Sequence, residues 1–276
     1  MLEAYTERWA LVTGASTGIG SEFAHLLASR GMHLVLTSRR QALLDELAAE
    51  LHTQHMTQTL VLPADLSEPD AAARLYDEIS EREIELDLLV NNAGFGFVGE
   101  VDETDVERMQ AMIQLNISAL TDLTYRVMPG MFERGHGAII NVASVVGFQP
   151  VAYMPVYSAS KAFVLHFSEA LWAEVRDRGV TVMALCPGTT ETEFFDVAGG
   201  PGWVKKHKAQ SARAVVDEAL RKLEKRRSFA VTGFWNYVRS LAPRFVTRKM
   251  VVTESMKYFR PQPRPQQDPG EVAGDE

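Results

Sequence analysis

The two residues of this sequence best suited to move a proton are a tyrosine and a lysine four positions apart, Tyr157 and Lys161. On a helix they would share one face, because residues four apart are neighbours on a helical surface. A nearby ammonium group favours the phenolate and lowers the pKa of a phenol from its usual value of about 10. We therefore expect Tyr157 to exchange a proton with a substrate, with Lys161 lowering its pKa.

A glycine-rich turn is the second chemical signal. The segment TGASTGIG, residues 13–20, lies between an expected strand and an expected helix. Such glycines permit a tight turn and a close backbone approach to a pyrophosphate, and the N-terminus of the following helix offers free N–H groups to phosphates. Glycines alone could mark an ordinary turn. Their position between the first strand and the first helix favours a nucleotide site.

The elements that would position these residues alternate along the chain. Strands are expected at 9–13, 33–37, 59–63, 87–91, 138–142, 181–185 and 228–231. Helices are expected at 18–29, 40–52, 69–82, 104–132 and 156–178, with a broken pattern after Gly188. Repeated strand–helix units favour a parallel sheet with helices on both faces. The sequence therefore predicts an α/β fold, a doubly wound parallel sheet in a single domain over residues 5–259.

Composition excludes several classes of protein. Of the 276 residues, 46% are hydrophobic and 23% are charged, which argues against a disordered or fibrous chain. Cys186 is the single cysteine, and no His/Cys cluster has the spacing of a zinc site, so we expect a reduced, cytoplasmic protein without a metal. The N-terminus lacks the pattern of a signal peptide, and no stretch approaches the roughly 18 apolar residues of a transmembrane span.

The net charge of −8 conceals a basic segment. Residues 203–250 carry 13 Lys and Arg against 3 Asp and Glu. No nucleic-acid-binding module accompanies them, so we expect no nucleic-acid partner. Within this segment, residues 234–252 have a basic amphipathic pattern that Pro243 should interrupt. The pattern fits peripheral contact with an anionic membrane or an acidic partner, but we favour a helix packed on its own domain or a second subunit, with its charges in solvent.

Two further segments depart from the strand–helix alternation. Residues 193–210 contain Phe194, Phe195 and Trp203 beside a GGPG run. This composition suits either a lid over an apolar substrate or a loop whose aromatic side chains pack into the core. Residues 260–276 contain four prolines and almost no large apolar side chains, which predicts a disordered tail.

Together the motifs resemble those of the short-chain dehydrogenase/reductase (SDR) family. TGASTGIG, Asn91-Asn92-Ala93-Gly94, Asn116, Ser144, Tyr157-x-x-x-Lys161 and Pro187-Gly188 follow the family's order and approximate spacing over residues 5–235. The resemblance implies a Rossmann-type sheet of about seven strands, a nicotinamide cofactor, carbonyl/alcohol redox chemistry and a homodimer or homotetramer. The additional length indicates a subgroup with an elongated C-terminal region.

The resemblance also assigns roles to individual residues. The expected catalytic residues are Asn116, Ser144, Tyr157 and Lys161. Ser144 would orient the substrate oxygen, and Asn116 would hold a water that links Lys161 to solvent, although an asparagine can equally be a structural hydrogen-bonder. The expected cofactor contacts, besides Tyr157 and Lys161, are Gly14, Ser16, Thr17, Gly18, Ile19, Gly20, Arg39, Asp65, Leu66, Asn91, Asn92, Ala93, Gly94, Pro187, Gly188, Thr190 and Thr192.

The end of the second expected strand should decide which nicotinamide cofactor is preferred. A carboxylate there would favour NAD(H), whereas this sequence has Thr37-Ser38-Arg39-Arg40. Arg39 can pair with a 2′-phosphate, so we predict a preference for NADP(H). Alternatively, Arg39 and Arg40 merely begin a solvated helix. Asp65 would contact the adenine ring or cap a helix, and Thr190 stands where the family usually has valine or isoleucine.

The leading hypothesis is an NADPH-dependent oxidoreductase for an apolar ketone or 3-oxoacyl thioester. A catalytically silent, cofactor-binding regulator is one alternative, but such proteins commonly lose the tyrosine or lysine that this chain retains. A lipid ketone reductase on a membrane surface is another, which vesicle binding would test.

Overall fold

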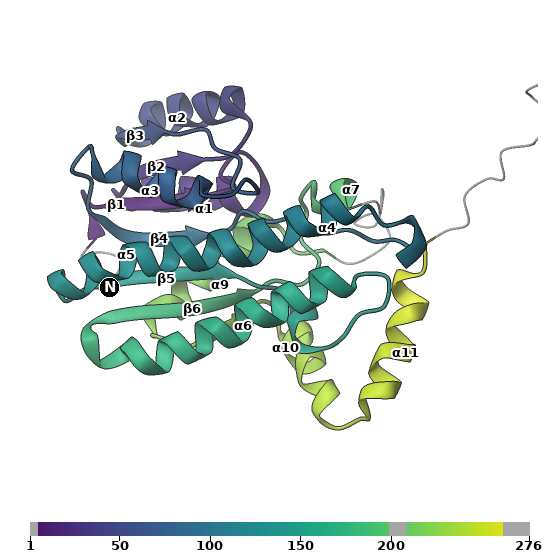
Figure 1. The fold of residues 1–276 in the computed structure, drawn as a ribbon. Helices are drawn as coiled ribbons and strands as arrows, with labels where there is room; N and C mark the ends of the chain where they lie inside the picture. The colour runs from purple at the N-terminus through teal and green to yellow at the C-terminus, as the bar shows by residue number, and fades with distance from the viewer. Residues whose placement is uncertain (1–4, 199–208, 262–276) are drawn as a thin grey trace, which may run out of the picture.

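A seven-stranded, wholly parallel sheet runs through the centre of the molecule (Figure 1). The structure is a computed structural model that describes residues 5–198 and 209–261. From edge to edge the strands are β3 (Thr59–Val61), β2 (His33–Thr37), β1 (Trp9–Thr13), β4 (Leu86–Asn91), β5 (Gly137–Val142), β6 (Val180–Cys186) and β7 (Phe229–Val231). The strand order reverses beside β1, the point at which open α/β sheets bind ligands outside the carboxyl ends of their strands.

Helices cover both faces of the sheet, as the doubly wound prediction requires. One face carries α1 (Gly18–Ala28), α2 (Gln41–His55) and α9 (Ala212–Glu224). The other carries α3 (Ala71–Ser80), α5 (Leu120–Arg134) and α6 (Pro155–Val175). The central strands read as continuous apolar runs because both of their faces are buried, β6 along its whole length. The core is therefore two apolar layers separated by the sheet.

The prediction of one continuous helix over residues 104–132 is wrong. The structure divides this stretch into α4 (Val106–Ile113), a π-helical stretch η3 (Gln114–Ala119) and α5. A π-helical turn accommodates one extra residue and is frequent at functional sites. The third strand also ends at Val61, before Pro63, which has no N–H to donate to the sheet.

The C-terminal region is a helical hairpin. α10 (Phe234–Leu241) ends in the short helix η6 (Ala242–Arg244), and α11 (Arg248–Phe259) then runs back towards the domain (Figure 1). The expected interruption at Pro243 is confirmed, because Pro243 lies in η6 between the two helices. Of the expected lid and tail, residues 199–208 and 262–276 lie outside the described residues.

Remaining short helices lie in the connections. They are η2 (Val101–Glu103), η4 (Val145–Phe148), η5 (Arg176–Arg178) and α7 (Phe194–Val197). Within residues 5–198 and 209–261, no helix combines the length and the apolarity needed to cross a bilayer.

Candidate active site

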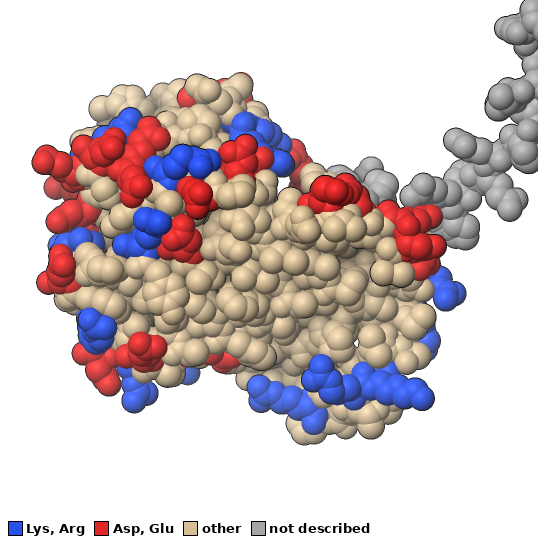
Figure 2. Space-filling model, viewed as in Figure 1, with Lys and Arg blue, Asp and Glu red and all other residues tan. Residues whose placement is uncertain are grey.

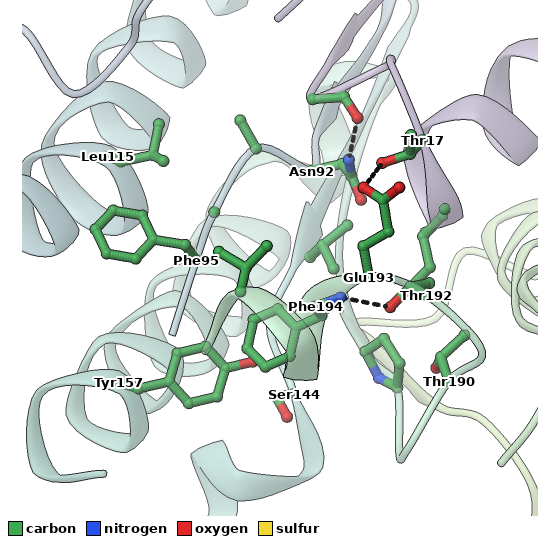
Figure 3. A pocket seen from close by; sticks show the side chains of 18 of the residues that line it. Thr17, Asn92, Phe95, Leu115, Ser144, Tyr157, Thr190, Thr192, Glu193 and Phe194 are labelled. Atoms are coloured by element: carbon green, nitrogen blue, oxygen red, sulfur yellow. Dashed lines mark hydrogen bonds between the residues drawn. The ribbon is translucent and has the colours of Figure 1, made fainter. Parts of the chain in front are cut away.

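One cavity of ≈ 430 Å³ opens at the carboxyl ends of the central strands and collects nearly all of the expected site residues (Figure 3). Gly20, Asn91 and Asn116 are the expected residues that do not line it. The lining comes from the turns after β1, β2, β3, β4, β5 and β6, together with α6 and α11. A parallel sheet produces this convergence because all of its carboxyl ends meet at one edge.

The glycine-rich turn is shaped by positions that admit no side chain. Gly14 has φ +64°, and a Cβ added there would lie 2.9 Å from the Ala93 Cα atom. Gly18 has φ +61°, and its added Cβ would lie 2.8 Å from Cγ2 of Thr192. Both positions use the left-handed backbone conformation that glycine adopts without strain. The turn thus leaves the N-terminus of α1 open to the cavity.

The neighbouring Asn91 and Asn92 serve different parts of the molecule. The Asn92 side chain donates hydrogen bonds to the carbonyl oxygens of Thr13 (2.9 Å) and Gly14 (3.1 Å), which holds the glycine turn beside β4. Asn91 is buried and donates to Asn141 Oδ1 at 2.9 Å, so it joins β4 to β5. Asn91 does not line the cavity, because it is the last residue of β4 and is buried against β5, whereas Asn92 lies in the turn that follows. The expected contact of Asn91 with a cofactor stays a prediction.

Gly20 likewise acts inside the turn. It is buried, and a Cβ placed on it would collide with the Gly14 carbonyl oxygen and lie 2.5 Å from Nδ2 of Asn92. The residue permits close packing of α1 on the turn and does not line the cavity; its expected contact with a cofactor stays a prediction.

Two arginines mark the far end of the cavity. Arg40 donates to Ser16 Oγ (3.0 Å) and Thr17 Oγ1 (2.7 Å), and it pairs with Glu193 at 3.0 Å. The Arg39 side chain is 71% exposed and lies 3.7 Å from Asp65. Both guanidinium groups therefore line the cavity, and Arg40, which we had expected to matter less, makes the more numerous contacts.

Asp65 is held in a turn by its neighbours. Its carboxylate accepts hydrogen bonds from the Ser67 N–H (2.9 Å) and hydroxyl (2.6 Å). Burial raises the pKa of Asp65, but the bonds from Ser67 and the charge of Arg39 outweigh this effect, and the net shift is downward. Since α3 begins at Ala71, Asp65 does not cap that helix.

Tyr157 and Lys161 lie on the same face of α6 and are 8% and 5% exposed. Ser144, in the turn after β5, lies beside Tyr157 in the cavity (Figure 3), and its side chain is close enough to the phenol to lower the pKa of Tyr157. The Lys161 Nζ atom donates to the Val142 carbonyl oxygen at 2.7 Å and lies 5.8 Å from the centre of the Tyr157 ring. The structure thus brings the expected proton donor, its hydroxyl neighbour and its ammonium neighbour together.

The pKa of Tyr157 shifts in the direction opposite to the one expected from the sequence. Burial raises the pKa of this phenol, and the nearby Ser144 side chain lowers it by less. Burial also lowers the pKa of Lys161, to about 8. Loss of hydration penalises the charged form of each group and is the largest cause of both pKa shifts. The prediction counted the charge of Lys161 but not the burial of both groups.

Asn116 lies in the π-helical stretch η3, behind Tyr157 and Lys161. Its side chain accepts from the Phe95 N–H at 3.2 Å and donates to the Phe95 carbonyl oxygen at 3.0 Å and to Ser160 Oγ at 3.1 Å. A Cβ on Gly94 would lie 2.9 Å from Asn116 Oδ1 and 3.5 Å from Lys161 Nζ. Asn116 therefore lies next to Lys161 across Gly94, buried behind the wall of the cavity.

The turn after β6 forms the opposite wall. The buried Thr190 hydroxyl donates to the Gly188 carbonyl oxygen at 3.0 Å, so the threonine that replaces the family's usual apolar residue has a partner within the turn. Pro187, Thr192 and Gly188 line the cavity. A Cβ on Gly188 would meet the side chain of Asn236, which comes from α10.

An apolar wall adjoins Tyr157. The Phe194 ring lies against the Tyr157 ring with centroids 5.2 Å apart, and Phe95 and Leu115 face it from across the cavity (Figure 3). Phe259 reaches the same cavity from α11. Sequence reasoning did not find Phe259, because no local pattern relates the end of a C-terminal helix to a turn about one hundred residues earlier.

Cys186 has a structural role. Its side chain is fully buried, and burial raises the pKa of its thiol. A thiol in this state is a small apolar core residue, as expected, rather than a nucleophile.

The geometry fits a nicotinamide dinucleotide. The glycine-rich turn, residues 14–20, forms a cradle that an added Cβ would fill, and it opens onto the N-terminus of α1. Two guanidinium groups, those of Arg39 and Arg40, lie at the outer end of this cradle. Backbone N–H groups and a helix dipole of this kind bind pyrophosphate. The cavity continues past this cradle to Ser144 and Tyr157, so a dinucleotide lying along it would extend to the buried hydroxyls.

Comparisons with known proteins agree with this geometry. Residues 8–199 match the family model of the short chain dehydrogenases. The chain is 37% identical over 196 residues to the very-long-chain 3-oxoacyl-CoA reductase of Anas platyrhynchos, covering 69% of this chain and 62% of that protein. It is 38% identical over 192 residues to sulfoacetaldehyde reductase 2 of Chromohalobacter salexigens, covering 69% of this chain and 75% of that protein.

A solved structure extends the comparison. The short-chain dehydrogenase from Sphingobium yanoikuyae in complex with NADPH is 34% identical, with a TM-score of 0.78, and the match covers 86% of this chain and 94% of that one. The chain spans less than two thirds of the length of the 3-oxoacyl-CoA reductases that it matches. The matched family model, the strand order and the shared motifs establish that this chain belongs to the short-chain dehydrogenase/reductase family.

Proposed function

We propose that this chain is an NADP(H)-dependent oxidoreductase that interconverts an apolar carbonyl compound and the corresponding alcohol. One observation carries the proposal: the hydroxyl groups of Tyr157 and Ser144 lie in one cavity, where the glycine-rich turn that can hold a dinucleotide meets an apolar wall (Figure 3). The printed activities of the relatives, 3-oxoacyl-CoA and sulfoacetaldehyde reduction, support carbonyl chemistry.

A bound nicotinamide would supply or accept the hydride. In reduction, the Tyr157 phenol donates its proton to the carbonyl oxygen, and in oxidation the phenolate accepts the alcohol proton. The raised pKa of Tyr157 suits the donor role, because the phenol stays protonated at neutral pH. Ser144 donates a hydrogen bond to the same oxygen and fixes its position.

Lys161 and Asn116 support this proton transfer from behind. With a pKa of about 8, Lys161 is mostly an ammonium at neutral pH and stabilises negative charge on the phenol oxygen. Asn116 lies beside Lys161 and orders Gly94 and Phe95. The second role proposed for Asn116, from the family resemblance, is to hold a water on the path from Lys161 to solvent.

The cofactor would lie along the glycine turn. Residues 14–19 would hold the pyrophosphate, Asp65 and Leu66 the adenine, residues 92–94 the central ribose, and residues 187–192 the nicotinamide. The cationic end formed by Arg39 and Arg40 supports NADP(H), because a guanidinium can bind a 2′-phosphate in a bidentate manner. NADPH in the Sphingobium relative supports the same preference.

The substrate class follows from the apolar wall. Phe95, Leu115, Phe194 and Phe259 offer no charge to a polar substrate, and they favour a medium or large apolar group next to the carbonyl. A 3-oxoacyl thioester or a bulky ketone meets this requirement. Residues 193–210 are the proposed lid over it, and a homodimer or homotetramer is the proposed assembly.

The test is cofactor oxidation over a panel of ketones, aldehydes and 3-oxoacyl thioesters, with NADPH and NADH in parallel and Tyr157→Phe as control. Turnover with an apolar carbonyl should fall about 10³-fold in Tyr157→Phe, the scale of general acid catalysis. NADPH affinity, measured by fluorescence, should change less than threefold. Tight NADPH binding with no turnover on any substrate would instead support a silent regulator.

The cofactor preference has its own test. Arg39→Ala and Arg40→Ala should each lower kcat/KM for NADPH about tenfold, because each removes a charged hydrogen-bond partner of a phosphate worth roughly 1.5 kcal/mol. The values for NADH should stay within threefold of the wild type. Equal losses with both cofactors would show that the arginines support the turn rather than select a phosphate.

A further inference from the structure

Exposed apolar side chains are concentrated in one projecting element, the C-terminal hairpin of residues 234–259. Nine of the sixteen exposed large apolar side chains of the described residues belong to it. They are Phe234, Trp235, Tyr237, Val238, Phe245, Val246, Met250, Met256 and Tyr258. Such a density marks an interaction surface, because single exposed apolar residues are normal but clusters are not.

The tip of the hairpin is exposed to solvent, whereas its base is hydrogen-bonded to the rest of the domain. Every residue from Arg244 to Met250 is exposed, and Phe245 at the turn is 84% exposed. At the base, Ser255 accepts a hydrogen bond from the Ala152 N–H at 3.0 Å, and Arg260 donates to the Tyr153 hydroxyl at 3.1 Å. The ribbon shows α10 and α11 extending away from the sheet to this tip (Figure 1).

The same hairpin is basic. It contains five Lys and Arg and one acid, Glu254, which pairs with Lys257 at 2.7 Å. The other four cations, Arg239, Arg244, Arg248 and Lys249, make no ion pair within the described part of the chain. Figure 2 shows Lys and Arg gathered along the lower edge of the molecule, where the hairpin lies, whereas most Asp and Glu of this face lie higher in the view, at the left and near the upper end of α11 (Figure 1).

We propose that the C-terminal hairpin docks on an anionic phospholipid bilayer. The aromatic and aliphatic side chains near the tip would enter the region between headgroups and acyl chains, where tryptophan and tyrosine are favoured. The four unpaired cations would lie among the lipid phosphates, where the negative surface potential of an anionic leaflet attracts each of them. The hairpin thus combines the two features that favour binding to an anionic membrane: apolar side chains that can insert and cations that can pair with lipid phosphates.

A second copy of this chain fits the hairpin less well. A two-fold contact places the same patch on both partners, so the four unpaired cations of one hairpin would face those of the other. Like charges that face each other across an interface repel and weaken the association. A bilayer of anionic lipid has no such conflict.

Docking would bring the site close to the membrane. Phe259, at the base of the hairpin, lines the cavity, and the 12 residues of α11 rise about 18 Å from the tip. The docking itself does not depend on the proposed reaction, because it rests on the hairpin alone. Its failure would leave the carbonyl chemistry untouched.

The experiment is flotation of the full chain with vesicles of phosphatidylcholine alone or with 30% phosphatidylglycerol. We expect binding to the anionic vesicles only, and its loss in 0.5 M salt. The double variant Arg244→Glu/Arg248→Glu should lower the partition coefficient at least tenfold. Lys225→Glu/Arg227→Glu is the matched control, because it reverses two exposed charges at the opposite end of β7 and should change the partition less than twofold.

Insertion of the apolar groups has a separate readout. Lipids brominated in the acyl chain should quench the emission of the wild type, and Trp235→Phe should remove most of this quenching while the other three tryptophans remain. Equal loss of binding in both charge-reversal variants, or equal binding to neutral and anionic vesicles, would overturn the proposal. So would a change of sedimentation coefficient in Arg244→Glu/Arg248→Glu without a change in vesicle binding, since that result would identify a contact between protein chains.

Discussion

The two halves of the cavity are built in different ways. The cofactor half comes from consecutive residues at the ends of β1, β2 and β3, where backbone and glycine define the shape. The substrate half is assembled from Phe95, Met154, Phe194 and Phe259, which belong to elements far apart in the chain. The first half therefore depends on local geometry, whereas the second depends on how distant elements pack. Changes in the cofactor half should affect every substrate alike, and changes in the substrate half should discriminate among substrates.

The largest effect should come from closing the glycine turn. Gly20→Ala would place its Cβ against the Gly14 carbonyl oxygen and the Asn92 side chain, so the turn must distort. We expect NADPH affinity, measured by titration calorimetry, to fall about 100-fold, the loss of roughly two charge-assisted hydrogen bonds. All substrates should lose activity by the same factor.

Gly135→Ala is the matched control for Gly20→Ala. Gly135 has φ +70° and an added Cβ would meet nothing within 4 Å, so the change introduces backbone strain without a collision. It should lower stability by about 1 kcal/mol and leave NADPH affinity unchanged. If both variants weakened NADPH binding equally, general destabilisation and not the shape of the turn would be the cause.

The pH dependence of kcat/KM should test the role of Lys161, which lies where the two halves of the cavity meet. Lys161, with its pKa lowered to about 8, loses its charge as the pH rises through this value. We expect kcat/KM for reduction to fall above about pH 8, approaching tenfold per pH unit, with every substrate. Lys161→Met should be slow at all pH values and should lose this slope; a slope retained in Lys161→Met would assign the titration to another group.

The free energy of unfolding should rise with pH over a range in which kcat/KM falls. Between pH 8 and the ordinary lysine value of 10.5, the unfolded chain binds more protons at Lys161 than the native chain does. The contribution of this group to the free energy of unfolding therefore rises with pH across that interval. Denaturant unfolding at several pH values, compared between wild type and Lys161→Met, would separate this effect from catalysis.

The smallest effect should be selective. Phe259→Ala removes one aromatic group from the substrate wall and leaves the cofactor half intact. We expect KM for a long-chain carbonyl compound to rise about fivefold, on the scale of 1 kcal/mol for partial loss of an apolar contact, with less than a twofold change for a short one. Phe163→Ala is the control, because Phe163 is an exposed aromatic residue of α6 that does not line the cavity. An equal rise for both chain lengths would show that Phe259 only supports the fold.

This difference also explains what the sequence could predict. The glycine turn and the Tyr157–Lys161 face follow from local spacing, and the parallel sheet follows from the repeated strand–helix units. The structure confirms all three. The sequence could not place Phe259 in the cavity, and it did not divide the helix at Asn116, because both depend on packing between distant elements.

The sequence also could not distinguish the roles of neighbouring residues. Asn91 and Asn92 have the same side chain, but only the second lines the cavity, since the strand ends between them. The direction of the Tyr157 pKa shift was missed for a related reason. A spacing of four residues reveals a nearby charge, but it does not reveal that both groups are withdrawn from water.

The strand order also has a kinetic consequence. β1 pairs with β4, so Trp9 must meet Leu86, and each neighbouring pair in the parallel sheet is joined through a crossover. Every contact that closes the sheet therefore spans a long loop, and such topologies fold slowly because loop entropy is lost before the pairing energy is gained. During synthesis, the glycine turn can acquire its Asn92 support only after the first ninety or so residues have emerged, and its packing against Thr192 follows about one hundred residues later. The nucleotide cradle is thus encoded at the start of the chain but is completed late in folding.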